Sequence, residues 1–320
     1  MCCMNSAAHG AVLAAEPFDI LARPPRDTPS QSDPTAVDAD AVLTWHALGL
    51  ETMSSLLVLS LRRLGDRSFE GRCQWPRTHP LNERTTTVAH HPLIVVESTR
   101  QLAVAVQRRH LPTATEADYE VLSVSLGLLP GCAPMESGSA TDVAVRLTLS
   151  DLVVRAGSAV SFRVTAEYLY AGRIFATCVM GCAAPLGDEP QPTGAVPPVP
   201  GLLHPAPAAV GAAAAPDVLL ARGPHGRLVI VPRDPAHPVL LPGRPSRLTT
   251  AAVLEAGRQA VLLSCGMTAR AVVGLRTDVR SPVPDRGAEI DVAFEAGGAR
   301  YVVTAAGRVV ATGAVGLLRT

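Results

Sequence analysis

The hydrophobic residues of this chain form helix-like and strand-like patterns that follow one another along its length. Residues 92–109 (PLIVVESTRQLAVAVQRR) and 250–267 (TAAVLEAGRQAVLLSCGM) are apolar on nearly all sides of a helix, which predicts two helices buried inside the fold. A strand-like run precedes each helix, SFEGRCQWP at 68–76 and GRLVIVPR at 226–233. Alternating apolar and polar positions follow each helix and predict a series of strands.

The two halves of the chain repeat each other. A common offset of 158 residues relates His79-Pro80, Glu97, Arg100 and Gln101 to His237-Pro238, Glu255, Arg258 and Gln259. A second match, at an offset of 135, relates AGRIFATCVMG (171–181) to AGRVVATGAVG (306–316). Because these matches occur in the same order, we interpret the chain as two copies of one structural unit. The smaller second offset indicates extra residues in the first copy, which we place mostly within 126–142.

The order of elements predicts the fold. Each copy reads as a strand, a buried helix and then a meander, and its final Ala-Gly pair suits a tight hairpin. This is the plan of a hotdog, an antiparallel sheet wrapped around one helix. We therefore predict an α+β double hotdog, with a disordered tail at 1–40, the first repeat at 41–185, a Pro/Ala-rich linker at 186–216 and the second repeat at 217–320.

Composition excludes several functional classes. The 320 residues include 28 basic and 28 acidic side chains, a balance that does not favour a nucleic-acid or membrane partner. All 28 basic residues are arginine, which excludes Schiff-base lysines, pyridoxal phosphate attachment and the phosphate-binding lysine of P-loops. The seven cysteines lack a disulfide or zinc spacing, and the N-terminus lacks the charged start of a signal peptide. We expect a cytoplasmic protein with reduced thiols and no metal.

The repeated helix motif is the main candidate site. Glu97, Arg100 and Gln101 share one helix face, as do their equivalents Glu255, Arg258 and Gln259. Such charges on a buried helix need a partner, so each Glu–Arg couple is either a structural pair or part of a functional pocket. In the functional interpretation, a cleft forms between the repeats, and His79 or His237 reaches the carboxylate of the opposite half.

Three segments carry a resemblance to a known family. FEGRCQWPRTHP (69–80), VVESTRQLAVAV (95–106) and VLEAGRQA (253–260) resemble the A-factor biosynthesis hotdog family, the AfsA-type γ-butyrolactone synthases of actinomycetes. At 246–251 the chain departs from that family, because it reads SRLTTA where the family has D-H-x-P-G-M.

The resemblance implies transfer of a β-ketoacyl group from an acyl carrier protein to dihydroxyacetone phosphate, in the synthesis of γ-butyrolactone-type signalling molecules. It needs no cofactor beyond the phosphopantetheine of the carrier, and it suits a monomeric pseudo-dimer or a homodimer. Glu255 and Arg258 take the family's functional positions, with Glu97 and Arg100 as equivalents. Glu255 is then the general base, with a pKa raised by burial, and an arginine holds the phosphate or the oxyanion. The residues expected to bind substrate are His79, His237, Gln101, Gln259 and Trp75.

Two other functions stay open. HPVLLPGRP (237–245) is similar to the histidine motif of hotdog dehydratases, but Glu255 follows His237 by 18 residues, a longer spacing than that motif has. A hotdog thioesterase or dehydratase acting on acyl thioesters is one alternative. The other is a double hotdog that binds acyl ligands or a partner without turnover, which the change at 246–251 favours. His46 is a minor candidate, and His79, His90 and His91 lack the carboxylate or cysteine spacing of a metal site.

Overall fold

The computed structural model describes residues 41–82, 88–112, 119–136, 138–184, 201–243 and 246–318. Both predicted helices are present: α1 spans Pro92–His110 and α2 spans Thr250–Cys265. Each begins at a side chain that accepts a backbone N–H, His91 for α1 and Thr249 for α2, so each first turn has a cap. The predicted tail at 1–40 lies outside the described residues.

The remaining elements are strands and short 3-10 turns. The first repeat contains β1 (Ala41–Val42), β2 (Val58–Arg63), β3 (Ser68–Pro76), β4 (Val88–Ala89), β5 (Glu120–Leu128), β6 (Met135–Glu136), β7 (Ala140–Arg155), β8 (Ser158–Tyr170) and β9 (Arg173–Ala183). The second contains β10 (Leu220–Arg222), β11 (Leu228–Ile230), β12 (Val272–Val279), β13 (Ala288–Glu295), β14 (Gly298–Ala305) and β15 (Arg308–Leu317). The 3-10 turns are η1 (His46–Leu48), η2 (Met53–Ser55), η3 (Pro130–Cys132), η4 (Pro207–Val210), η5 (Ala215–Asp217), η6 (Pro224–Gly226) and η7 (Ala269–Ala271).

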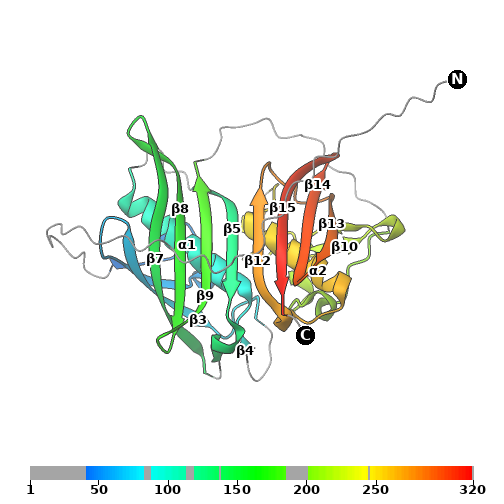
Figure 1. Ribbon diagram of the computed structural model, residues 1–320, viewed down its shortest axis with the longest axis horizontal. Helices are drawn as coiled ribbons and strands as arrows, with labels where there is room; N and C mark the ends of the chain where they lie inside the picture. Colours follow the sequence, from blue (N-terminus) through cyan, green and yellow to red (C-terminus); the bar gives the residue numbers. More distant parts are fainter. Residues whose placement is uncertain are drawn as a thin grey trace. The chain divides into compact units, whose positions relative to one another are not determined.

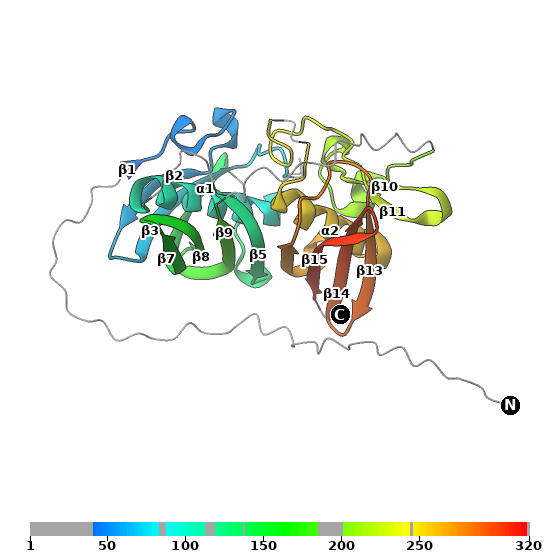
Figure 2. The same cartoon turned by 90° about the horizontal axis from the view of Figure 1, so that it is seen from above.

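One antiparallel sheet joins the two repeats. Within the described residues its 13 strands follow the order β1-β2-β3-β7-β8-β9-β5-β12-β15-β14-β13-β11-β10. The repeats meet at its middle, where β5 pairs with β12 and Leu126 lies opposite Leu275 (Figure 1). Both helices lie on the same side of this sheet (Figure 2). The protein is therefore an α+β double hotdog, and the predicted fold is confirmed.

The strand pattern explains how the sheet encloses the helices. Along β7, Val143, Val145, Leu147 and Leu149 are buried and the residues between them are exposed, because neighbouring side chains of a strand point to opposite faces. These buried residues of β7 belong to the same core cluster as Leu93–Val96 of α1, which are all nearly inaccessible to solvent. Burial of these apolar faces supplies the main favourable term of folding.

The final hairpin of each repeat has the predicted geometry. Ala171-Gly172 has φ angles of 48° and 76°, and Ala306-Gly307 has 48° and 75°, as a two-residue type I′ turn requires. The extra length of the first repeat is misplaced in our sequence interpretation, however. Strands β7 and β8 have 16 and 13 residues, whereas their counterparts β13 and β14 have 8 each. Much of the extra length therefore lies in the β7–β8 hairpin, which extends beyond 126–142.

The segment before the second repeat differs in part from the predicted linker. Residues 201–216 contain η4 and most of η5, and Val210 and Ala212 pack with Val218 and Leu263 in a small separate core. A Pro/Ala-rich composition predicts an extended linker, but proline also starts 3-10 turns, and η4 buries Val210 in the small core that includes Leu263 of α2. The rest of the predicted linker, 186–200, lies outside the described residues.

In the part of the chain that the structure describes, neither helix combines the length and apolar character required to cross a lipid bilayer.

Candidate functional site

The two copies of the helix motif have the same geometry. In α2, Arg258 donates from Nε to Oε2 of Glu255 at 2.8 Å and from Nη2 to Oε1 at 2.6 Å. In α1, Arg100 makes the same pair of bonds to Glu97, at 2.8 and 2.7 Å. A bidentate contact of this kind, with two N–H···O bonds between one guanidinium and one carboxylate, is a strong, directional ion pair. The repeat seen in the sequence therefore extends to the side-chain contacts.

The glutamine of each motif ties the helix to the start of its own repeat. Gln101 accepts from the Leu57 amide at 3.0 Å and donates to the Ser55 carbonyl at 2.8 Å. Gln259 likewise accepts from the Leu219 amide at 2.9 Å and donates to the Asp217 carbonyl at 2.7 Å. Each glutamine also donates to the glutamate of its motif. Both N–H groups of each amide are thus used inside the protein, and substrate binding by Gln101 and Gln259 stays a prediction.

The pKa expected for Glu255 is wrong in direction. Burial alone raises the pKa of a carboxyl group, and Glu255 is only 2% exposed. Arg258, His91 and Gln259 outweigh that effect and leave the pKa of Glu255 below its usual value of 4.5. Glu255 is therefore ionised at neutral pH, which a base requires, but it is a weaker base than burial alone would make it.

The two Glu–Arg pairs differ in access to water. The Arg100 side chain is 32% exposed, whereas that of Arg258 is fully buried. The cover over Arg258 is the η4 segment, because Nη2 of Arg258 donates to the Gly211 carbonyl at 2.9 Å. Nη1 of the same guanidinium is buried with no hydrogen-bond partner in the described structure. An unpaired buried N–H is costly and needs an explanation.

Three histidines share one hydrogen-bonding pattern. Nδ1 of His79 accepts the Leu81 amide at 3.3 Å, Nδ1 of His91 accepts the Leu93 amide at 3.2 Å, and Nδ1 of His237 accepts the Leu240 amide at 3.0 Å. A nitrogen that accepts cannot carry the proton in a neutral ring, so the proton is on Nε2 in each case. Each of these rings therefore presents an N–H from its outer edge.

His91 is the histidine that contacts the acidic group of the opposite repeat. Its Nε2 lies 3.7 Å from Oε2 of Glu255, and both side chains are buried. Burial lowers the pKa of His91 to about 4, so the ring is neutral at pH 7. We expected His79 or His237 to make this contact. The position of His91 follows from its place at the start of α1, next to α2, where its Nδ1 is used as the cap.

His79 and His237 lie in the same cluster but have different partners. Nε2 of His237 donates to Oδ1 of Asp217 at 2.9 Å. Nε2 of His79 is buried and has no partner in the described structure. His79 is nevertheless close enough to Glu97, His90, His237 and Asp217 for their charges to act on its pKa, which burial lowers to about 4.

The remaining predicted residues have structural surroundings. Trp75 is fully buried, and its Nε1 donates to Oγ of Ser98 at 2.9 Å, so it belongs to the core and its contact with substrate stays a prediction. His90 bonds to Asn82 and Thr141, and His46 stacks on Trp45. Among the described residues, no cluster of three or more His, Cys, Asp or Glu side chains is arranged to hold a metal ion.

Residues 246–251, where the sequence differs from the AfsA-type pattern, make structural contacts. Arg247 forms an ion pair with Glu120 of the first repeat, and Thr250 donates its hydroxyl to the Val121 carbonyl. Thr249 caps α2 by accepting the Ala252 amide at 3.1 Å. These side chains hold the repeats together and start the helix.

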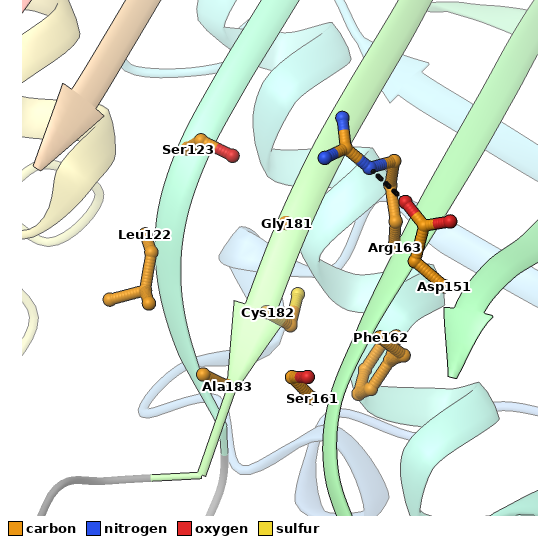
Figure 3. Close-up of a pocket in the computed structure, with 9 residues that line it drawn as sticks. All are labelled: Leu122, Ser123, Asp151, Ser161, Phe162, Arg163, Gly181, Cys182 and Ala183. Atoms are coloured by element: carbon orange, nitrogen blue, oxygen red, sulfur yellow. Dashed lines mark hydrogen bonds and ion pairs between the residues drawn. The ribbon is translucent and has the colours of Figure 1, made fainter. Parts of the chain in front are cut away.

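A surface hollow of about 210 Å³ lies elsewhere on the first repeat. It is formed by β5, β7, β8 and β9, and the ion pair between Arg163 and Asp151 spans one side of it (Figure 3). None of the predicted site residues lines this hollow. We therefore place the candidate site at the buried junction of α1 and α2.

Comparison with known proteins gives partial likenesses only. No protein-family model matches the sequence, and no curated protein matches it. The dehydratase domain from the terminal module of the rifamycin polyketide synthase is 16% identical with a TM-score of 0.45, over 86% of this chain and 99% of that one. A protein of Thermobifida fusca assigned as a thioesterase II is 14% identical with a TM-score of 0.45, over 81% and 97%. An acyl-CoA thioesterase II of Mycobacterium marinum is 13% identical with a TM-score of 0.38, over 81% and 94%. At these values the likenesses carry no argument about activity.

Proposed function

We propose that this protein processes acyl thioesters at the junction of its two repeats, and that it transfers a β-ketoacyl group from an acyl carrier protein to the hydroxyl of dihydroxyacetone phosphate. The observation that carries the proposal is the contact between His91 of the first repeat and Glu255 of the second. It places an ionised carboxylate beside the neutral imidazole of His91, and both side chains are buried. Acyl transfer to a hydroxyl needs this combination of an acceptor and donors.

The reaction is a direct exchange at the acyl carbon. The acceptor hydroxyl attacks the thioester carbonyl, the new C–O bond forms, the C–S bond breaks, and the carrier leaves as a thiol that receives the hydroxyl proton. Glu255 accepts the hydroxyl proton during attack and passes it to the departing sulfur. Histidine N–H groups stabilise the oxyanion. No acyl-enzyme is required.

The arginines have separate tasks in this proposal. Arg258 keeps Glu255 ionised and fixed in orientation through its two bonds. Arg100 is a third exposed, so an anionic group that arrives from solvent has access to it. A fixed, planar cation is well suited to the phosphate of the acceptor.

Binding without turnover is the second candidate function. The lowered pKa of Glu255 favours it, because strong pairing to Arg258 weakens the carboxylate as a base. Arg247 adds to this, since it occupies the family's histidine position and is engaged in an ion pair with Glu120.

The test is intact-protein mass spectrometry of a β-ketoacyl carrier protein incubated with the chain, with and without dihydroxyacetone phosphate. Loss of the acyl group only when the acceptor is present supports acyl transfer. Loss without the acceptor identifies a thioesterase, and loss of water from a 3-hydroxyacyl carrier identifies a dehydratase. An unchanged acyl carrier over a range of chain lengths, with folded protein, contradicts an enzymatic function and leaves binding.

A further inference from the structure

The two repeats place different side chains at equivalent positions around the junction of α1 and α2. The offset of 158 residues relates His91 to Thr249, and both cap their helices. Only His91 places an imidazole beside a glutamate of the opposite repeat. The second repeat offers the methyl and hydroxyl of a threonine instead, and that hydroxyl is used for capping.

A second pair of equivalent residues differs in the same sense. Gln101 and Gln259 bind the carbonyls of Ser55 and Asp217 respectively, so these two residues occupy equivalent places. Asp217 accepts the Nε2–H of His237. Ser55 has no carboxylate, and its hydroxyl bonds to Thr52. His79, the equivalent of His237, is consequently left with an unpaired N–H at 2% exposure.

As a result of these differences, the hydrogen-bond donors at the junction come from the first repeat and the carboxylate acceptor comes from the second. His79 and His91 of the first repeat both present Nε2–H groups at the junction, while Glu255 supplies the carboxylate from the second. His91 links the two, because Glu255 and His79 are both near enough to act on its pKa. In the second repeat, the corresponding imidazole and hydroxyl are satisfied within the protein. A buried donor without a partner costs stability, and a ligand with an acceptor atom removes that cost.

We propose that each chain has a single acyl site, not two, and that the Nε2–H of His79 donates to the carbonyl oxygen of the bound acyl group. The inference deepens the proposed function by naming the group that binds the carbonyl, and it concerns binding rather than turnover. The polar atom of the ligand must be an acceptor, because His79 is neutral with its proton on Nε2. The carbonyl oxygen of a thioester meets that requirement.

The test uses a stable analogue of β-ketoacyl-pantetheine in which a methylene replaces the thioester sulfur. Titration calorimetry is expected to give one analogue per chain. The substitution His79→Asn keeps an acceptor near the position of Nδ1 and removes the Nε2–H, so affinity is expected to fall tenfold or more while the melting temperature is unchanged or rises. The matched substitution His237→Asn removes the N–H that donates to the Asp217 carboxylate. It is expected to lower the melting temperature.

Infrared spectroscopy gives a measurement on the unmodified protein. The analogue is labelled with ¹³C at the carbonyl that corresponds to the thioester carbonyl. Binding is expected to shift the carbonyl stretch to lower frequency, as a hydrogen bond to that oxygen requires. Two analogues per chain, an unshifted stretch, equal affinity of wild type and His79→Asn, or no binding would each overturn the inference. Binding that follows the expected pattern without any turnover would contradict the acyltransferase proposal and leave this one intact.

Discussion

Nε2 of His91 lies 3.7 Å from Oε2 of Glu255, across the junction of two repeats that are joined by the pairing of β5 with β12. Neither repeat contains both groups, so the candidate site depends on the double fold. The distance is longer than a hydrogen bond, and each group is held by its own repeat. His91 is fixed by the Leu93 amide, and Glu255 is fixed by Arg258 and Gln259.

The two glutamates are expected to differ in both stability and activity. Glu255→Gln leaves Arg258 charged and fully buried, so it should lower the free energy of unfolding by about 3–5 kcal/mol. Glu97→Gln should cost only about 1 kcal/mol or less, since Arg100 is 32% exposed and can be solvated. Denaturant unfolding measures the two values. Equal losses would show that the difference in burial has no energetic consequence.

Acyl transfer can be separated from this loss of stability. The double variant Glu255→Gln/Arg258→Met removes both charges of the buried pair and should recover much of the stability, yet it should have no acyl-transfer activity. Glu97→Gln/Arg100→Met is the matched control and should retain chemistry at the acyl carbon, with weaker binding of the phosphate acceptor. An active Glu255→Gln/Arg258→Met protein would exclude Glu255 as the base.

Acid should destabilise the protein through its buried histidines. The pKa values of His79 and His91 are lowered from 6.5 to about 4 in the folded state. Between these pH values the unfolded chain binds protons that the folded chain does not, so stability falls as the pH falls. Each histidine contributes up to about 1.4 kcal/mol per pH unit in this window. Denaturant unfolding at pH 7, 6 and 5 measures the slope.

The expected pH dependence takes account of the charged and titratable groups around His79 and His91. Glu97 and Asp217 favour protonation of His79, while His90 and His237 oppose it, and burial exceeds all of them. Glu255 and Asp217 favour protonation of His91, and Arg258 and His79 oppose it. His79→Asn should reduce the slope by roughly half. An unchanged slope in this variant would show that His79 titrates normally in the folded protein.

Local patterns were sufficient to predict the helices, the meanders and their duplication. The apolar faces of 92–109 and 250–267 mark buried helices, and the Ala-Gly pairs mark hairpins. These features depend on residues close together in the sequence. The fold followed from them because a sheet wrapped around the two helices buries most of their apolar side chains.

The site itself was only partly predictable, because its contacts join distant segments. His91 was visible as a histidine before a helix, but its partner depends on how α1 meets α2. The lowered pKa of Glu255 depends on the two-pronged contact with Arg258, and sequence spacing shows proximity without orientation. Asp217 lies next to a Pro/Ala-rich stretch and gave no signal of its contact with His237.

The η4 segment should tolerate no side chain at Gly211. This residue has a φ of +62°, and an added Cβ would lie 2.9 Å from Cβ of Ala269 and 3.0 Å from Nη1 of Arg258. Gly201 has a φ of +81° with no atom within 4 Å of such a Cβ. Gly201→Ala therefore measures the cost of the backbone conformation alone, about 1 kcal/mol. Gly211→Ala should cost clearly more, and equal melting temperatures would show that η4 does not pack closely over Arg258.

Exchange of the two helix caps tests whether His91 of the first repeat has a role in the reaction that Thr249 of the second repeat lacks. His91→Thr places on α1 the residue that caps α2, so the first turn keeps a side-chain acceptor and stability should change by less than about 1 kcal/mol. The imidazole beside Glu255 is lost, and the rate of acyl transfer should fall roughly 10²- to 10⁴-fold. Thr249→His is the matched control and should leave the rate near that of the unmodified protein. The measurement is the initial rate of acyl loss from the carrier protein, together with the melting temperature of each variant. A His91→Thr protein that is stable and fully active would show that the contact between His91 and Glu255 serves the fold and not the reaction.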